Sequence, residues 1–136
     1  MKLTFTSTQI KGKGRGVLLG YPTINCVIPK NFSLLFGIYA AFISIHSNKY
    51  MGALHYGPIP TFSENQKSLE IFVIDADPSI FTDNPLTNIT ITVVKKIRDI
   101  RTFRSSEDLS TQIGNDVLYI RKHLKSSDCS NTLRVI

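Results

Sequence analysis

Apolar and polar residues alternate along much of the first hundred positions of this 136-residue chain. In residues 88–97 (NITITVVKKI), two isoleucines and a valine alternate with threonines, which is the pattern of a strand with one buried face. Other segments also have strand character, namely residues 3–10, 24–28, 37–46, 50–56 and 69–74. The sequence SNK at residues 47–49 predicts a turn between two of these strands.

A different periodicity begins after residue 104. Ser105 is a suitable helix N-cap, with Asp108 at the capping-box position three residues later. Apolar residues then recur at helical spacing, at Leu109, Ile113, Val117, Ile120 and Leu124. This pattern predicts one amphipathic helix whose apolar stripe packs on a body built of strands.

Six short strands followed by one helix favour an all-β fold, a closed antiparallel barrel with a covering helix. A parallel α/β sheet is disfavoured because no helices separate the strands. Residues 75–85 are rich in structure-breaking residues and are expected to form a loop. We expect one domain over residues 1–124, followed by a flexible polar tail at residues 125–136.

The composition, with 42% hydrophobic and 19% charged residues, is that of a globular domain and excludes a disordered chain. The N-terminus lacks the apolar segment of a signal peptide, and Cys26 and Cys129 do not suggest a disulfide framework. These features predict a cytoplasmic protein. The net charge is +6, and the basic residues fall in three clusters. A charge cluster is more often a solvated surface than a binding site, so the net charge alone favours no function.

The sequence KGKGRG forms a loop with alternate glycines, Gly12, Gly14 and Gly16. Glycines let successive backbone N–H groups turn towards one anion, and Lys13 and Arg15 add positive charge. The loop therefore suits a polyphosphate, although a mobile hairpin loop explains the same residues. It is neither a P-loop nor a dinucleotide fingerprint, because those motifs open a helix and here we expect a strand to follow.

The sequence GYPTIN follows this loop directly. Pro22 fixes its own backbone and pushes Tyr21 into an extended conformation. On an extended segment Thr23 and Asn25 point to the same side. Their hydroxyl and amide oxygens suit Mg²⁺, which keeps water and phosphate oxygens as its other ligands. Spacing alone leaves open the alternative that both side chains only satisfy backbone groups in a turn.

These two motifs together resemble the riboflavin kinase (flavokinase) domain family, which also forms the C-terminal half of bacterial bifunctional riboflavin kinase/FAD synthetases. Further elements follow in the family's order and are similar to its patterns: GIY at residues 37–39, GPIPTF at 57–62, LEI at 69–71, RDIRTF at 98–103 and the helix at 106–116. An ordered series of elements over residues 3–124 is far more specific than any single motif.

The resemblance implies a six-stranded antiparallel Greek-key barrel with a C-terminal helix. It also implies a reaction, the transfer of the γ-phosphoryl group of ATP to the 5′-hydroxyl of riboflavin, which gives FMN and ADP with the help of Mg²⁺. On this template residues 12–16, with Tyr21 and Pro22, bind ATP, and Thr23 and Asn25 hold the metal.

The same resemblance makes Glu70 the catalytic base. On its strand Glu70 shares one face with Phe72 and Ile74, while the intervening apolar residues share the other. The flavin is expected to lie beside Arg98, Arg101 and Phe103. A bland alternative stays open for that segment, in which Phe103 packs at the helix entry and the arginines are solvated.

Two stretches depart from the family's patterns. The family's Asp-Phe-x-x-Asp-Leu-Tyr-Gly is replaced by DADPSIFT at residues 75–82. Its Asn-[Ile/Val]-Gly-x-[Arg/Asn]-Pro becomes HYGPIP at residues 55–60, which loses an asparagine and a polar or basic residue. We expect these departures to affect loops that face the nucleotide and the flavin, and so affinity and substrate choice more than chemistry.

Two functions from different classes therefore remain. The first is a riboflavin kinase that uses small-molecule substrates, works as a monomer and has neither nucleic-acid nor membrane partners. The second is a non-catalytic module of the same barrel that binds a flavin or a nucleotide. Nucleic-acid binding is disfavoured because the aromatic residues cluster in predicted strands and the basic residues in loops.

Overall fold

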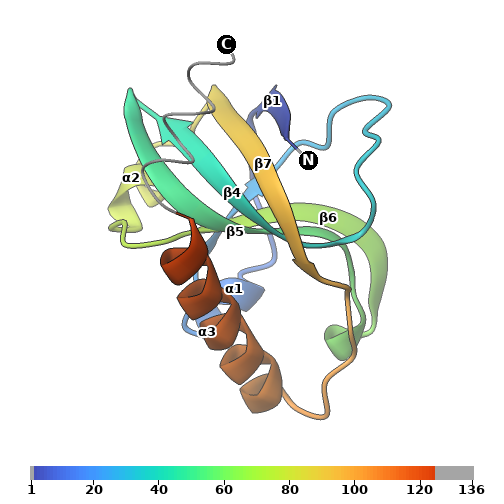
Figure 1. Ribbon diagram of the computed structural model, residues 1–136. Coiled ribbons are helices and arrows are strands. Elements are labelled where there is room, and N and C mark those ends of the chain that lie inside the picture. The colour runs from blue at the N-terminus through green and yellow to red at the C-terminus, as the bar shows by residue number, and fades with distance from the viewer. Residues whose placement is uncertain (1, 125–136) are drawn as a thin grey trace.

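A strongly curled antiparallel sheet with a long helix against its outer face makes up the computed structural model, which describes residues 2–124 (Figure 1). The strands are β1 (Leu3–Ser7), β2 (Gln9–Ile10), β3 (Thr23–Cys26), β4 (Gly37–Ile45), β5 (Asn48–Ile59), β6 (Glu64–Val73) and β7 (Ile89–Arg98). The helices are α1 (Arg15–Leu18), α2 (Ser79–Thr82) and α3 (Ser106–His123), with a 3₁₀ turn η1 (Pro60–Phe62).

The seven strands lie in the order β1-β7-β4-β5-β6-β3-β2, and all pairs are antiparallel. Strands β4, β5 and β6 follow one another as a meander, and β7 then returns to lie beside β4. This arrangement is a Greek key. The structure thus confirms the predicted all-β Greek-key architecture with a C-terminal helix.

The first predicted strand is divided in two at Thr8. Before this residue the chain pairs with β7 at one edge of the sheet, and after it with β3 at the other edge. Thr8 itself spans the junction, since its carbonyl accepts from the Val27 N–H at 2.9 Å and its hydroxyl donates to the Thr87 carbonyl at 2.9 Å. One continuous segment therefore links the two edges, and the six predicted strands become seven.

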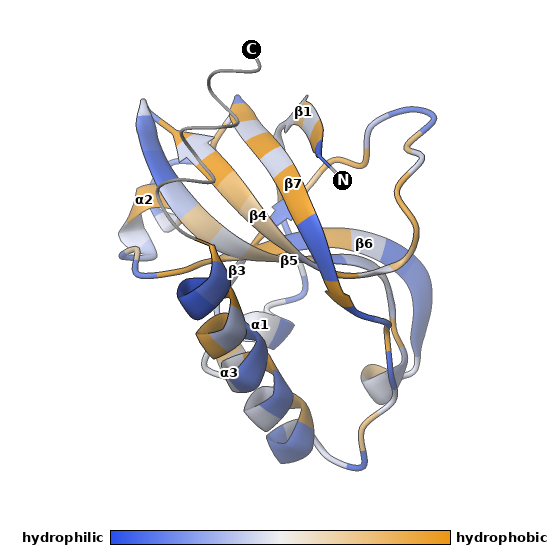
Figure 2. Ribbon diagram, viewed as in Figure 1, coloured by the Kyte–Doolittle hydropathy of each residue, from blue (hydrophilic) through white to orange (hydrophobic). Residues whose placement is uncertain are grey.

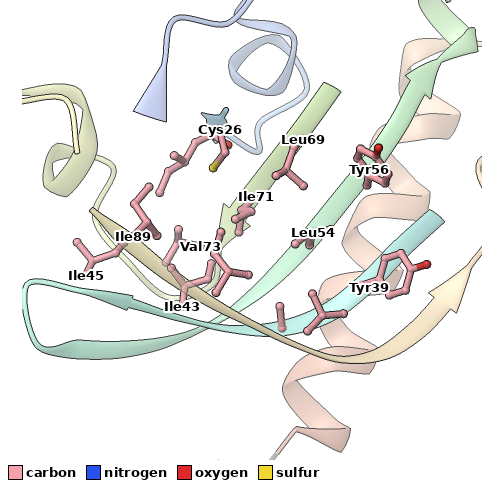
Figure 3. Packing of buried hydrophobic residues seen from close by; sticks show 14 of the residues in the cluster. Cys26, Tyr39, Ile43, Ile45, Leu54, Tyr56, Leu69, Ile71, Val73 and Ile89 are labelled. Carbon is pink, nitrogen blue, oxygen red and sulfur yellow. The ribbon is translucent and has the colours of Figure 1, made fainter. Parts of the chain in front are cut away.

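The concave face of the sheet encloses the main hydrophobic core (Figure 3). Alternate residues of each strand point into it, so Leu69, Ile71 and Val73 of β6 meet Leu54 and Tyr56 of β5 there. Leu54 and Ile71 have no exposed surface. Because strand side chains alternate, the residues between them, Glu70 among them, are directed to the convex face.

Helix α3 covers part of the convex face and begins as predicted, with the Ser105 hydroxyl accepting from the Asp108 N–H at 3.1 Å. Its apolar side faces the sheet while hydrophilic residues face outward (Figure 2). Val117, Ile120 and Leu124 form a second buried cluster with Ala40 and Phe42 of β4. The fold therefore has one core inside the curled sheet and another between the sheet and α3.

Three local predictions need correction. The hairpin turn between β4 and β5 is His46-Ser47, one residue earlier than expected, and both residues have positive φ angles, as a two-residue type I′ turn requires. The second half of the glycine-rich loop, from Arg15, already belongs to the single turn α1, which precedes β3. Residues 75–85 contain the short helix α2. Such short helices carry too little periodicity to be read from a sequence.

Some expectations concern segments that lie outside the described residues, namely the flexible tail at residues 125–136 and the state of Cys129.

Cys26 is a free and buried thiol, and burial raises its pKa to about 12. Among residues 2–124, none of the helices is both long and apolar enough to cross a membrane.

The contact between α3 and the sheet gives a stability prediction. Ile120 is fully buried, whereas Leu118 on the same helix is 61% exposed. We expect Ile120→Ala to lower the free energy of unfolding by about 2–5 kcal/mol, because it leaves a cavity. Leu118→Ala should change it by less than about 0.5 kcal/mol. Urea unfolding of the two variants checks this, and equal losses would contradict the packing described.

Candidate functional site

A cavity of about 780 Å³, measured with its open mouth, lies between the convex face of the sheet, α1 and α3. The predicted site residues that line it are Arg15, Gly16, Tyr21, Thr23, Glu70, Arg98, Arg101 and Phe103. The remaining predicted residues, Gly12, Lys13, Gly14, Pro22 and Asn25, are not part of its wall. The fold thus brings residues from distant parts of the chain to one cavity.

Strand register explains why these residues meet. Asn25 of β3 pairs with Glu70 of β6, which pairs with His55 of β5. The row continues through Ile38 of β4 to Arg98 of β7. Directly paired residues of antiparallel strands share a face, so this row runs across the convex side of five strands. The cavity lies above the row.

Glu70 is held at the cavity wall by two hydroxyl groups. The Thr23 hydroxyl donates to Oε1 at 3.0 Å, and the Ser68 hydroxyl donates to Oε2 at 2.9 Å. Ser68 reaches the carboxylate because it lies two residues earlier on the same strand and so on the same face. Each carboxylate oxygen can accept a further hydrogen bond, which leaves Glu70 fixed in orientation but open to a ligand.

Thr23 and Asn25 lie on the same face of β3, as predicted, but in different surroundings. Since the Thr23 hydroxyl gives its hydrogen to Glu70, its lone pairs remain free for a cation. The Asn25 carboxamide packs against the backbone of Gly12, where an added Cβ would lie 2.0 Å from Asn25 Nδ2. Any side chain larger than hydrogen at position 12 would displace the Asn25 carboxamide, so Gly12 keeps that group in place.

The donor set at this point consists of hard oxygens: a hydroxyl, a carboxamide and the nearby Glu70 carboxylate. Among residues 2–124 no three His, Cys, Asp or Glu side chains gather as a metal site. Mg²⁺ commonly binds few protein groups and retains water and phosphate oxygens, so this sparse set fits that ion better than zinc.

The glycine-rich loop lies beside η1 and the start of β6. Arg15 Nε donates to Glu64 Oε2 at 2.7 Å, and Lys13 Nζ lies 3.3 Å from Glu64 Oε1. The Arg15 guanidinium also lies over the Phe62 ring, 4.7 Å from its centroid. Gly14 has a φ of +73°, which favours glycine. The loop therefore reaches the cavity through Arg15 and Gly16.

Tyr21 occupies the angle between β6 and α3. Its ring meets the Phe72 ring edge-on, with the centroids 5.1 Å apart. A Cβ added at Gly114 would lie only 2.8 Å from the Tyr21 hydroxyl oxygen, so the hydroxyl packs closely against this glycine of α3. The neighbouring Leu19 carbonyl accepts from the Ser110 hydroxyl of α3 at 2.9 Å. These contacts fasten the segment between α1 and β3 to the helix.

A buried ion pair stabilises the opposite end of the cavity. Arg98 Nη2 lies 2.9 Å from Asp116 Oδ2 of α3, and Gln112 Nε2 donates to the same carboxylate at 3.0 Å. The Arg98 and Arg101 guanidinium groups lie 5.6 and 5.2 Å from the Phe103 ring centroid. Arg98 is therefore not a solvated loop residue, and the segment after β7 forms an ordered wall.

Comparison with known proteins assigns the family. The family model of riboflavin kinase (flavokinase) matches residues 1–124. The chain belongs to the riboflavin kinase family. It is 37% identical to a bifunctional riboflavin kinase/FMN adenylyltransferase of Buchnera aphidicola, over 84% of this chain and 36% of that protein. It is 34% identical to the RNA-binding riboflavin kinase RibR of Bacillus subtilis, over 87% of this chain and 50% of that one.

The chain thus spans between about a third and a half of the length of these curated relatives. Solved structures show the same fold. A riboflavin kinase from Trypanosoma brucei aligns with a TM-score of 0.57 at 18% identity, over 89% of this chain and 78% of that chain. A protein from Streptococcus pneumoniae, described as a macrolide-efflux protein, aligns with a TM-score of 0.75 at 24% identity, over 90% and 39%.

His55 is a cavity residue for which we predicted no role, at a position where the riboflavin kinase pattern has asparagine. Its Nε2 lies 2.8 Å from the Gly57 carbonyl, and because a carbonyl only accepts, Nε2 carries the hydrogen. Burial lowers the pKa of His55, and this outweighs the hydrogen bond to the Gly57 carbonyl and the charge of Glu70, which both act to raise the pKa. The only indication of His55 in the sequence was that it replaces the asparagine of the family pattern.

The other departure lies elsewhere. No residue of the altered segment 75–82 lines the cavity. Phe81 is buried in the main core, with Ala76 and Ile80 packed against it, and Asp75 pairs with Arg121 of α3 at 2.7 Å. Our expectation that this segment faces the ligands is therefore wrong for this cavity, whereas Pro58, Ile59 and Pro60 do line it.

The lowered pKa of His55 predicts a pH dependence of stability. Below the ordinary His pKa of 6.5 the unfolded chain binds a proton that the folded protein resists, so stability falls as the pH decreases. We expect wild type to lose more stability between pH 7.5 and 5.5 than His55→Asn, which cannot titrate. Thermal melting at both pH values checks this, and parallel losses would contradict it.

Proposed function

We propose that this protein is a riboflavin kinase that transfers the γ-phosphoryl group of ATP to the 5′-hydroxyl of riboflavin, giving FMN and ADP. The observation that carries the proposal is the position of Glu70, a carboxylate oriented by Thr23 and Ser68 at the wall of the cavity. Family membership supports the reaction class. Catalysis of phosphoryl transfer relies mainly on positioning and on electrostatic stabilisation, which suits a site with few catalytic groups.

In this mechanism Glu70 orients the ribityl 5′-hydroxyl and accepts its proton as the oxygen attacks the γ-phosphorus. The bond between the γ-phosphorus and the bridging oxygen breaks, and ADP leaves with that oxygen. The cationic loop at residues 12–16 lies over the phosphates, and Tyr21 and Pro22 border the nucleotide. Thr23 and Asn25 would hold Mg²⁺, which would supply charge neutralisation at the phosphate oxygens.

The flavin lies at the other end of the cavity. Ile100, Phe103, Leu109 and Ile113 offer an apolar wall there, which suits the flat ring system. The ion pair of Arg98 with Asp116 holds this wall in place. In the row across the convex face Glu70 lies between Asn25 of β3 and Arg98 of β7, an order that supports transfer from one end of the cavity to the other.

The first test is FMN formation from riboflavin and Mg²⁺-ATP, followed by chromatography. We expect Glu70→Gln to lower kcat by at least about a hundredfold, because the amide cannot accept the proton, while riboflavin binding persists. Glu107→Gln removes an exposed carboxylate on α3 and serves as the matched control. Saturable riboflavin binding without turnover by wild type would contradict the kinase and favour a non-catalytic flavin-binding module.

The metal assignment is tested separately with Thr23→Val, which has nearly the same shape but lacks the hydroxyl. We expect the KM for Mg²⁺-ATP to rise about tenfold, since the hydroxyl contributes both to the metal and to Glu70. Thr111→Val on the exposed side of α3 is the control. Unchanged kinetics of Thr23→Val would remove this residue from the metal site.

The remaining assignments are proposals of the same kind: a monomer in the cytoplasm that binds small molecules and neither nucleic acid nor a membrane. One relative is named as RNA-binding, but the chain covers only half of that protein. The basic residues Lys13, Arg15 and Arg98 are engaged by acidic partners, which leaves less free positive charge than the net value of +6 suggests.

A further inference from the structure

Glu64 is a partly buried carboxylate that has no part in the mechanism above. It begins β6, with Ser63 between it and η1, and its side chain is only 13% exposed. Partial burial acts to raise its pKa, but the hydrogen bonds and charges of Arg15 and Lys13 outweigh burial and lower the pKa. Glu64 is therefore anionic at neutral pH and is committed to the glycine-rich loop.

The two oxygens of Glu64 are divided between the two cations of this loop. Oε2 accepts from Arg15 Nε at 2.7 Å, and Oε1 lies 3.3 Å from Lys13 Nζ. Lys13 is 65% exposed, so its pair is weak. Arg15 is 37% exposed and makes a short charge-assisted hydrogen bond, which is the stronger contact.

Arg15 is restrained from a second direction by Phe62 of η1. The guanidinium lies 4.7 Å from the ring centroid, while Glu64 holds Nε at its edge. Phe62 thus covers one face of the planar guanidinium and Glu64 covers one edge, and the two residues are only two positions apart. Within residues 2–124 the side-chain hydrogen bond of Arg15 involves Nε alone, and the side chain lines the cavity. Both terminal nitrogens therefore remain for an anion.

From this geometry we infer that Glu64 is a positioning residue for the phosphate loop, a role that rests on the proposed function. It accepts the Nε–H of Arg15 and thereby directs the two terminal nitrogens of Arg15 to the polyphosphate of the nucleotide. Planar bidentate recognition of phosphate depends on the orientation of the guanidinium. The backbone cannot supply this orientation, because α1 holds it at Arg15 but leaves the long side chain free to rotate.

A carboxylate beside a phosphate site can also weaken phosphate binding, because it repels the anion and occupies the cations that would bind it. The contact through Nε favours positioning over competition, because Nε is the one donor that a phosphate bound by both terminal nitrogens does not need. The two effects predict opposite changes when the carboxylate is removed, so binding measurements distinguish them.

Binding of a non-hydrolysable ATP analogue with Mg²⁺, measured by calorimetry, tests the inference without turnover. We expect Glu64→Ala to weaken binding about tenfold, and Glu64→Gln, which can still accept from Nε, about threefold. Arg15→Lys keeps the charge but lacks the planar fork, and should lose about as much as Glu64→Ala. The riboflavin dissociation constant, read from flavin fluorescence, should stay within twofold of wild type in all three variants.

Glu107→Gln is the matched control and should alter neither ligand. Equal or tighter binding of the analogue by Glu64→Ala would overturn the inference and identify Glu64 as a competitor of phosphate. If Glu64→Ala does not fold, Glu64→Gln and Arg15→Lys carry the test, and a loss in Arg15→Lys below twofold would overturn it. If wild type forms FMN while the Glu64 and Arg15 variants bind the analogue as wild type does, the inference about Glu64 fails and the proposed function stands.

Discussion

The antiparallel pairing of β3 with β6 is the constraint on which the candidate site depends. It places Asn25 opposite Glu70 and Thr23 opposite Phe72, so the hydroxyl of Thr23 reaches the Glu70 carboxylate. A shift of one residue in this register would turn Glu70 into the main core and Leu69 out of it. The apolar residues on the concave face therefore fix the orientation of the polar ones on the convex face.

For this reason the concave face of the sheet forms the main core, whereas the convex face carries the candidate site. The concave face is filled by the packed apolar side chains of the main core, as Figure 3 illustrates. The convex face is covered by α3 over only part of its area, and the uncovered part becomes the wall of the cavity. The ion pair of Arg98 with Asp116 and the contact of Tyr21 with Gly114 fasten both ends of this arrangement to the helix.

Much of the fold could be predicted from the sequence because its signals are local. Alternation in residues 88–97 and the stripe after Ser105 each lie within one element, and both predictions are confirmed by β7 and α3. The division of the first strand at Thr8 could not be predicted, since it depends on pairing with two strands far apart in the chain. The short helices α1 and α2 were missed for lack of periodicity.

The site was predictable only in part. Glu70, Thr23 and Asn25 lie on one face as their period-2 spacing suggests, although Asn25 packs on Gly12 rather than in the cavity wall. His55 pairs with Glu70 across strands and Glu64 contacts the glycine-rich loop, and spacing along the chain carries no trace of either contact. Ser68 lies two residues before Glu70 on the same strand, a period-2 relation that the sequence does contain but that we did not use. The segment 75–82 was misplaced because its departure from the family pattern reports a change in core packing as readily as a change in a ligand loop.

A crystal structure of the protein with ADP, Mg²⁺ and FMN tests the central claim most directly, because it locates both ligands relative to the sheet. The account predicts the FMN phosphate beside Glu70, the diphosphate under the loop at residues 12–16, and the flavin ring against the wall that includes Phe103. A nucleotide or flavin bound away from the convex face of β3 and β6 would contradict it.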